Sequence, residues 1–352
     1  MDHPLVLGIE TSCDDTACAV LDGAGRVLSS VVSSQLAAHR PYGGVVPEIA
    51  SREHLANWPA VSGEALARAA VSLREVEVVA ATRGPGLVGA LLVGLSVGKA
   101  IAFARSLPFH AVHHLEGHLY SPFLRPPGDP EAPEPPPGRF VGLVLSGGHS
   151  SLFAVEDGAV STLGETRDDA LGEVFDKVGK RLGLPYPQGP RVDELAERGD
   201  PSAFRLPVPG CGDTLDFSYS GLKSQTLTEI ERLERRLGPI DLGTGDDPPQ
   251  EVLDLLAAFR ASAIGQVLDR LNRLHGRLPF ERLAVSGGAA ANRLLRRELP
   301  GWAAAHGAEL RLVPLVYSGD NAAMIAHAAL LRHRRGIADD PFAAEAESRI
   351  PL

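Results

Sequence analysis

The stretch that decides the fold lies near the start of the chain, at residues 5–20, and reads LVLGIETSCDDTACAV. Residues 5–10 form an apolar run that is typical of a buried strand, TSCDD is a polar turn, and TACAV returns as a second strand. Asp22-Gly23 marks another turn before a third strand at 26–32. The stretch therefore predicts a three-stranded β-meander whose first loop is acidic.

A second stretch with the same pattern begins at residue 141 and reads VGLVLSGGHSSLFAV. A strand again runs into a polar turn, a second strand returns, and Asp157-Gly158 turns the chain towards a third. Any two β-meanders share this outline. However, the spacing from Glu10 to Asp22 nearly equals that from Ser146 to Asp157, and helical segments follow both copies. We infer a duplication that gives two α/β lobes with a cleft between them.

The segment between the two copies, 125–139, carries seven prolines in fifteen residues. Proline-rich sequence cannot form a helix or a central strand, so an extended, solvent-exposed connection is expected there. The expected division has an N-terminal lobe, this connection, a C-terminal lobe, a helix that packs back on the first lobe, and a tail. Their bounds are 1–124, 125–139, 140–320, about 321–337 and 338–352.

Composition describes an ordinary globular chain of 352 residues, 44% hydrophobic and 22% charged. We find no signal peptide and no apolar run of ~18 residues free of charges and turn signals, so no membrane span is expected. Three cysteines without a CxxC pair favour a reducing cytoplasm. The net charge of −10 disfavours direct binding of nucleic acid, although basic residues cluster at 177–181, 293–297 and 332–335. Such clusters are more often solvated helix faces, so composition leaves the partner open.

Several glycine-rich turns follow predicted strands. Gly84-x-Gly86-x-x-Gly89 has Pro85 inside it and no suitably placed acidic residue after it, so a tight strand-to-helix turn is favoured over dinucleotide binding. The segment 94–99 has neither the spacing nor the hydroxyl residue of a P-loop. The SGG loop at 146–148 is either a hairpin turn or a donor-rich loop for phosphate or a polar acyl group. Gly287-Gly288 ends another strand, and a helix with free first-turn N–H groups is expected directly after it.

The sequence HLEGH at 114–118 places two histidines one helical turn apart, where both can bind one metal ion. A zincin protease needs Glu directly after the first His, but Leu115 stands there. Asp320 is the candidate third ligand, with capping of the helix that follows it as the alternative role. Spacing alone does not decide between a metal site and a chance pair of histidines.

Nine motifs in a fixed order resemble the tRNA N6-adenosine threonylcarbamoyltransferase family (TsaD type, formerly labelled O-sialoglycoprotein endopeptidase). They are GIETSCDDTACAV, PEIASREH, RGPGLVGALLVG, HLEGH, LSGGHS, GEVFDKVGKRLGLPYPQGP, FSYSGLKS, SGGAAANRLLR and SGDNAAMIA, from about residue 5 to residue 330. The resemblance implies a duplicated actin/hexokinase-like fold (ASKHA, ribonuclease H-like) with the active site in the interlobe cleft. It also implies transfer of the threonylcarbamoyl group of threonylcarbamoyl-AMP to the N6 amine of adenosine 37, in tRNAs reading codons that begin with A.

Carried over residue by residue, the resemblance implies an Fe²⁺ or Zn²⁺ ion held by His114, His118 and Asp320. It implies substrate binding by Val144, Leu145, Ser146, Gly147, Gly148, Asp176, Gly189, Asp193 and Asn292. The implied partners are tRNA and, in a bacterium, a smaller paralogue (TsaB type) and a P-loop ATPase (TsaE type). Ser150, Gln188, Ala289-Ala290 and Ser318-Gly319 depart from the usual motifs, but none of them removes a proposed ligand.

The general base of the transfer is not identified by the motifs. Glu10 and Asp14 in the first polar loop are the candidates, with turn formation or capping as their alternative roles. A small-molecule kinase of the same superfold is the alternative function, although it would not require two histidines and a distant aspartate. A non-catalytic scaffold would be expected to lack these ligands.

Overall fold

A computed structural model of the chain describes residues 4–208, 210–244 and 247–352. The chain forms two compact units, each described here by itself. Unit 1 comprises residues 1–136 and 313–352, and unit 2 comprises residues 137–312. The proline-rich segment therefore belongs almost entirely to unit 1, and Asp320 lies in unit 1 with the two histidines.

The sheet of unit 1 has five strands in the order β3-β2-β1-β4-β5. Strands β1 and β2, and β2 and β3, pair antiparallel, whereas β4 and β5 continue the sheet parallel to β1. The carboxyl ends of β1, β4 and β5 thus lie along one edge, where ligands bind in open α/β sheets. The strands are β1 (Val6–Glu10), β2 (Asp15–Leu21), β3 (Val27–Ser34), β4 (Val78–Gly84) and β5 (Phe109–His113).

The sheet of unit 2 repeats this plan, with the order β10-β9-β6-β7-β8. Its first three strands again pair antiparallel in sequence, and its fourth strand again lies parallel to its first. The shared strand order confirms the predicted duplication, which the equal spacing of the two turns had suggested. The strands are β6 (Arg139–Leu145), β7 (Ser150–Glu156), β8 (Ala159–Gly164), β9 (Arg282–Ser286) and β10 (Glu309–Leu312).

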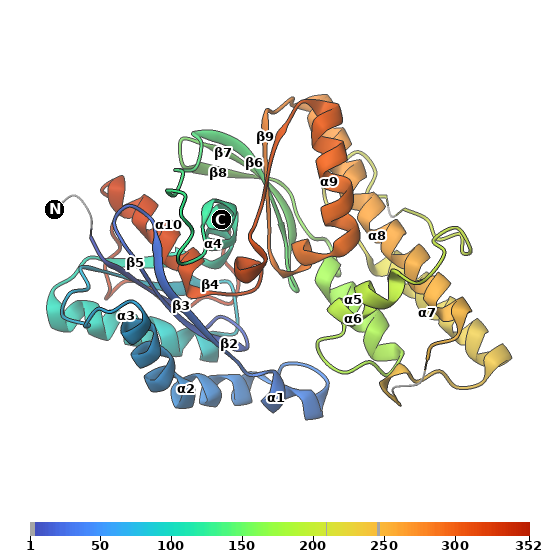
Figure 1. Cartoon of the computed structure of the whole chain (residues 1–352), viewed down its shortest axis with the longest axis horizontal. Helices are drawn as coiled ribbons and strands as arrows, with labels where there is room; N and C mark the ends of the chain where they lie inside the picture. Colours follow the sequence, from blue (N-terminus) through green and yellow to red (C-terminus); the bar gives the residue numbers. More distant parts are fainter. Residues whose placement is uncertain (1–3, 209, 245–246) are drawn as a thin grey trace. The chain divides into compact units, whose positions relative to one another are not determined.

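Helices cover both faces of the unit 1 sheet (Figure 1). One face contacts α2 and α3, and the other contacts α10, which also packs against α4. Residues of β1 and β4 such as Ile9 and Val79 are fully buried in the resulting core, which explains the apolar runs of the sequence. The helices are α1 (Leu36–His39), α2 (Pro47–Arg68), α3 (Val88–Arg105), α4 (His114–Tyr120) and α10 (Ala322–Arg334).

The core of unit 2 lies between β6 and the helices that follow β8. Phe175 and Phe259 pack with their ring centroids 4.8 Å apart at its centre, between α5 and α8. The helices are α5 (Leu171–Arg181), α6 (Gly189–Ala196), α7 (Ser220–Leu237), α8 (Gln250–Arg277) and α9 (Arg293–His306).

One predicted helix boundary is wrong. The chain does not enter a helix directly after Gly287-Gly288: a 3₁₀ turn spans Gly288–Ala291, and α9 begins at Arg293. The reason is Asn292, whose side chain accepts a hydrogen bond from Leu295 N at 3.0 Å. Asparagine is among the best N-cap residues, so the helix starts after it rather than after the glycines.

The C-terminal segment 337–352 stays on unit 1. Asp339 N donates to Phe109 O at 2.9 Å, Ala344 is buried in the core, and Glu347 N donates to Arg83 O at 2.9 Å. Near the end of the chain, Ile350 O lies 3.2 Å from His113 Nε2. The tail is therefore packed onto the unit that carries the two histidines.

Among the described residues one helix, α3, is long and apolar enough to span a membrane by length and composition. In this structure α3 contacts β4 on one side and α2 on another, and only a third of it is buried.

Candidate active site

The two histidines of HLEGH project from α4, which follows β5 without a loop. His118 is fully buried and His114 is 6% exposed. Their rings lie with centroids 4.7 Å apart. Between them, Gly117 faces α10 so closely that an added Cβ would lie 2.9 Å from Ile325 Cδ1. A residue with a side chain there would force the side chains of Ile325 and Met324 on α10 to shift.

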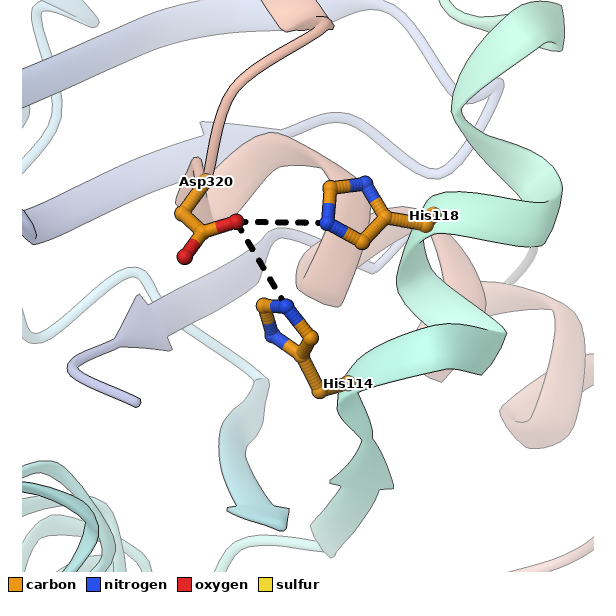
Figure 2. A group of neighbouring side chains, drawn as sticks. All are labelled: His114, His118 and Asp320. Carbon is orange, nitrogen blue, oxygen red and sulfur yellow. Dashed lines mark hydrogen bonds and ion pairs between the residues drawn. The ribbon is translucent and has the colours of Figure 1, made fainter. Parts of the chain in front are cut away.

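Asp320 lies in the loop before α10, and its carboxylate points at both imidazoles (Figure 2). Asp320 Oδ1 is 3.2 Å from His118 Nε2 and 3.5 Å from His114 Nε2. The alternative role of Asp320, capping the helix, belongs instead to Asn321, whose Oδ1 accepts from Met324 N at 3.0 Å. One potential ligand atom from each of the three residues lies within 4.8 Å of the others. The structure thus brings together the three predicted ligands from opposite ends of the chain.

Behind His114 lies Glu10, the last residue of β1, with no exposed surface. Its Oε2 is 3.0 Å from His114 Nδ1 and accepts a hydrogen bond from Thr82 Oγ1 at 2.6 Å. Its Oε1 accepts from Ser12 N, while Ser12 Oγ lies 3.2 Å from His114 Nδ1. Sequence reasoning placed Glu10 near the chemistry but did not foresee its contact with His114, because the two residues are far apart in sequence.

The charges of this group shift its pKa values strongly. Burial alone would lower the pKa of His114, but the carboxylates of Asp320 and Glu10 outweigh it and raise that pKa to about 10. Burial also lowers the pKa of His118, which its bond to Asp320 only partly offsets. His114 in return holds the pKa of the Asp320 carboxyl well below its usual range, against the effect of burial. His114 thus lies between two carboxylates, that of buried Glu10 and that of half-buried Asp320.

The donor set suits a divalent transition metal. Two imidazole nitrogens and one carboxylate oxygen are the ligands of many zinc sites and of non-haem iron sites, both of which keep positions open for substrate or water. His118 Nδ1 is buried without a hydrogen-bond partner, so the ring is held by Nε2 alone. The residues present thus fit Zn²⁺ or Fe²⁺.

The acidic loop 11–14 carries the other predicted base, Asp14, and Asp15 follows it as the first residue of β2. The backbone O of Asp14 accepts from Gln35 N at 2.9 Å, which holds the loop against β3. Burial, and then the charge of Asp320, raises the pKa of Asp15 to about 7. Asp15 was not singled out from the sequence, although it follows Asp14 directly.

The SGG loop of unit 2 follows β6 and is fixed at its two ends. Ser146 N donates to His149 O at 2.7 Å, and Gly172 N at the start of α5 donates to Ser146 O at 3.2 Å. Gly147 and Gly148 are exposed, and their N–H groups donate to no acceptor within the described part of the chain. Val144 and Leu145 precede the loop with fully buried side chains, so only their backbone can contribute to binding.

The remaining predicted substrate residues meet in two pairs in unit 2. Asp176 Oδ1 accepts from Gly189 N at 2.7 Å, which joins α5 to the start of α6. Asp193 Oδ1 accepts from Asn292 Nδ2 at 2.9 Å, and Asp193 Oδ2 accepts from Arg293 N at 2.9 Å. Buried Arg260 also donates to Asp193 Oδ1, at 3.1 Å. Arg260 was not singled out from the sequence; it directly follows the apolar run 255–259 in α8.

Two further motifs have structural roles. A Cβ on Gly86 would lie 2.6 Å from Ser12 O, so the GPG turn packs against the acidic loop rather than around a cofactor.

The basic clusters are largely engaged within the chain. Lys177 pairs with Asp169 and Glu173, Arg297 with Glu197, and Arg332 with Asp339. These pairs favour the solvated-face interpretation of the clusters.

The duplicated sheets and their flanking helices define the actin/hexokinase-like class of α/β proteins. Two solved structures share this fold at low sequence identity. HypF of T. kodakarensis aligns with a TM-score of 0.60 at 13% identity, over 95% of this chain and 48% of that one. Component A of the Acidaminococcus fermentans (R)-2-hydroxyglutaryl-CoA dehydratase aligns with a TM-score of 0.51 at 15% identity, over 95% and 99%.

The family is defined by sequence. The profile of the TsaD family, tRNA N6-adenosine threonylcarbamoyltransferase, matches residues 26–327. The enzyme of that name from Pelobacter propionicus is 49% identical over 92% of this chain and 90% of its own length. The one from Syntrophobacter fumaroxidans is 47% identical over 98% and 99%. The chain belongs to the tRNA N6-adenosine threonylcarbamoyltransferase family, which disfavours the kinase alternative.

Proposed function

We propose that this chain transfers the threonylcarbamoyl group of threonylcarbamoyl-AMP to the N6 amine of adenosine 37, in tRNAs that read codons beginning with A. Family membership across 26–327 supports the reaction class. The observation that carries the proposal is the convergence of His114, His118 and Asp320 on one point. A kinase of the same fold does not require this group.

The reaction exchanges one bond for another. The adenine N6 attacks the carbamoyl carbon, the bond from that carbon to the phosphate oxygen breaks, and AMP leaves while the amine loses a proton. Because AMP is a good leaving group, most of the barrier is in holding the amine and the carbonyl together and in stabilising developing charge.

His114, His118 and Asp320 would hold one Fe²⁺ or Zn²⁺ ion. Such an ion acts as a Lewis acid on an oxygen of the donor or orients the threonylcarbamoyl group. Glu10 and Ser12 keep the His114 ring in place through Nδ1, which leaves Nε2 directed at Asp320.

Unit 2 would bind the nucleotide part of the donor. The unpaired N–H groups of Gly147 and Gly148 suit phosphate oxygens, because successive backbone donors without side chains form an anion site. Asp193 and Asn292 are hydrogen-bonded to each other, and buried Asp193 also accepts from Arg293 N, so this pair would shape the nucleotide site rather than offer free groups to it. Asp14 remains the candidate base for the amine proton.

The partners follow from the reaction and from the charge. The substrate is tRNA, yet the net charge is −10 and the basic clusters are largely paired. We expect a smaller TsaB-type paralogue and a TsaE-type P-loop ATPase to complete the complex and to supply positive surface. The proposed location is the cytoplasm, with no membrane contact.

The test is reconstitution with labelled threonine, bicarbonate, ATP, a threonylcarbamoyl-adenylate synthase, both partners and unmodified tRNA. Mass spectrometry of the digested tRNA should show threonylcarbamoyladenosine only when this chain is present. Phosphorylation of a small substrate with stoichiometric use of ATP, and an unmodified tRNA, would support the kinase instead.

A further inference from the structure

Glu10 is a buried carboxylate whose oxygens are both occupied within the chain. Oε1 accepts from Ser12 N, and Oε2 receives Thr82 Oγ1 and His114 Nδ1. The residue has no exposed surface, so it cannot meet a substrate amine without unfolding part of β1. A general base must come within hydrogen-bond reach of the proton that it removes. These contacts therefore argue against Glu10 as the base that removes the proton of the adenine amine.

The same contacts decide which nitrogen of His114 carries the proton. An ionised carboxylate only accepts hydrogen bonds, so Nδ1 must be the protonated nitrogen of a neutral His114 ring. The lone pair is then on Nε2, which lies on the side of Asp320 and His118. Metal-binding histidines in general depend on such a second hydrogen bond, which fixes both the tautomer and the ring orientation.

The two histidines of α4 differ in this respect. His114 Nδ1 has Glu10 and Ser12 beside it, whereas His118 Nδ1 is buried with no hydrogen-bond partner. His118 is held by packing and by its Nε2 contact with Asp320, whereas His114 is also held through Nδ1 by Glu10 and Ser12. Loss of the Glu10 carboxylate therefore affects one ligand selectively.

We propose that Glu10 is a positioning residue of the metal site: its carboxylate holds His114 in the tautomer and orientation that bind the metal. This role rests on the proposed metal site at His114, His118 and Asp320. It replaces the role of general base that the sequence suggested for Glu10.

Glu10→Gln tests the role because an amide cannot reproduce the pattern in either orientation. With its oxygen towards His114, its NH₂ group faces the N–H of Ser12, donor against donor. With its oxygen towards Ser12, its NH₂ group donates to His114 Nδ1 and moves the ring proton to Nε2, which then cannot bind a metal. A carboxylate-to-amide change that leaves the shape intact is known to trap the wrong histidine tautomer in this way.

The experiment measures Zn²⁺ affinity of the full chain by competition with a chelating dye, and the visible absorption of the Co²⁺ form. Glu10→Gln should weaken Zn²⁺ binding about 10–100-fold and shift the Co²⁺ bands. The matched control is Thr16→Val, which removes a buried hydroxyl on the neighbouring strand that bonds to His54 and touches no metal ligand. It should leave affinity and spectrum unchanged. Thr82→Val should show a smaller loss, and it serves as the test if Glu10→Gln does not fold.

Transfer activity separates positioning from base catalysis. If Glu10 only positions His114, saturating Zn²⁺ should restore most of the transfer lost in Glu10→Gln. A variant that binds Zn²⁺ like the wild type, or one that stays inactive at saturating Zn²⁺, overturns the role. Equal losses of affinity in Glu10→Gln and Thr16→Val overturn it as well. A wild-type chain that binds neither metal contradicts the metal site itself.

Discussion

The two units share one strand order but differ in the loop that follows their first strand. In unit 1 that loop, 11–14, follows buried Glu10, carries Asp14 and leads into Asp15 of β2, whereas the loop 146–149 of unit 2 carries two exposed glycines. Carboxylates suit cations and histidine ligands, whereas bare N–H groups suit anions. The two copies of one strand order therefore carry loops of opposite chemical character.

The difference extends to the last strand of each sheet. After β5, the chain enters α4 with the two histidines, whereas after β10 it leaves unit 2 and returns to unit 1 with Asp320. The segment that follows β10 thus belongs to unit 1 and places Asp320 beside the two histidines. The two copies thus keep the same strand order but differ in the loops at the carboxyl ends of their strands.

The largest effect should come from Asp320→Ala, which removes one of three ligands. We expect Zn²⁺ affinity to fall by more than about 100-fold, beyond the loss typical of a residue that only supports a ligand. Nucleotide binding by unit 2 should be unchanged. Zn²⁺ competition and nucleotide titration measure the two.

The matched control for Asp320→Ala is the adjacent Asn321→Ala. It removes the N-cap of α10 and the Nδ2 hydrogen bonds to Tyr317 O and Gly319 O, so it should cost about 1–3 kcal/mol of stability but should lower Zn²⁺ affinity less than Asp320→Ala does. If Asp320→Ala lost nucleotide affinity as strongly as metal affinity, the proposal that unit 1 binds the metal and unit 2 binds the nucleotide would be contradicted.

Asp193→Ala should have the next effect, this time in unit 2. It removes one of the two carboxylates that pair with buried Arg260, the other being Glu197, and it leaves Arg293 N without its acceptor, so we expect a loss of about 1–3 kcal/mol. Urea unfolding measures the loss, and the metal content of the folded fraction should stay normal.

The control on the same helix is Glu194→Ala, whose exposed side chain pairs only with exposed Arg191. It should change stability by less than about 0.5 kcal/mol. Comparable losses in the two variants would contradict the structural role of Asp193.

Removal of residues 341–352 should destabilise unit 1 by about 3 kcal/mol. Three hydrogen bonds between the tail and the rest of unit 1 are lost, at about 1 kcal/mol each. They join Lys99 Nζ to Ala344 O, Glu347 N to Arg83 O, and His113 Nε2 to Ile350 O. Thermal unfolding of the truncated chain measures the effect. Removal of only residues 351–352 keeps all three bonds and should leave the unfolding temperature unchanged; an equal drop would contradict the account.

The smallest effect is on the free energy of unfolding at low pH. Burial, with Arg332 and His333 nearby, lowers the pKa of His110 in β5 to about 4. In the unfolded chain His110 takes up a proton near pH 6.5, whereas in the folded chain it stays neutral down to about pH 4. His110 therefore costs the folded state no stability above pH 6.5, and the free energy of unfolding decreases as the pH falls from 6.5 towards 4. At pH 5 the loss is about 2 kcal/mol.

His110→Phe removes that dependence without losing a hydrogen bond, because both ring nitrogens lack partners in the structure. The difference in unfolding free energy between pH 8 and pH 5 should shrink by about 2 kcal/mol in the variant. An unchanged difference would show that His110 is already protonated in the folded chain at pH 5.

The parts of the fold that could be predicted from the sequence are those with a local pattern. The strands of both meanders, the duplication and the pairing of His114 with His118 all depend on residues close in sequence. Asp320 could be named as a candidate third ligand, but no spacing rule connects it to HLEGH, and the resemblance was needed to join it to the two histidines.

What could not be predicted depends on contacts between distant segments. Asn321 rather than Asp320 caps α10, and Asn292 delays the start of α9. The bond between Glu10 and His114 joins the ends of β1 and β5, which only the sheet order brings together. For the same reason, a buried arginine such as Arg260 gives no signal in the sequence of its own helix.

The most direct test of the central claim compares metal content with transfer in His118→Ala, in the reconstituted reaction with tRNA. We expect the variant to fold and to lose bound metal. The rate of threonylcarbamoyladenosine formation should fall by the same factor as the metal content. A metal-free His118→Ala that modifies tRNA at the wild-type rate would contradict the central claim.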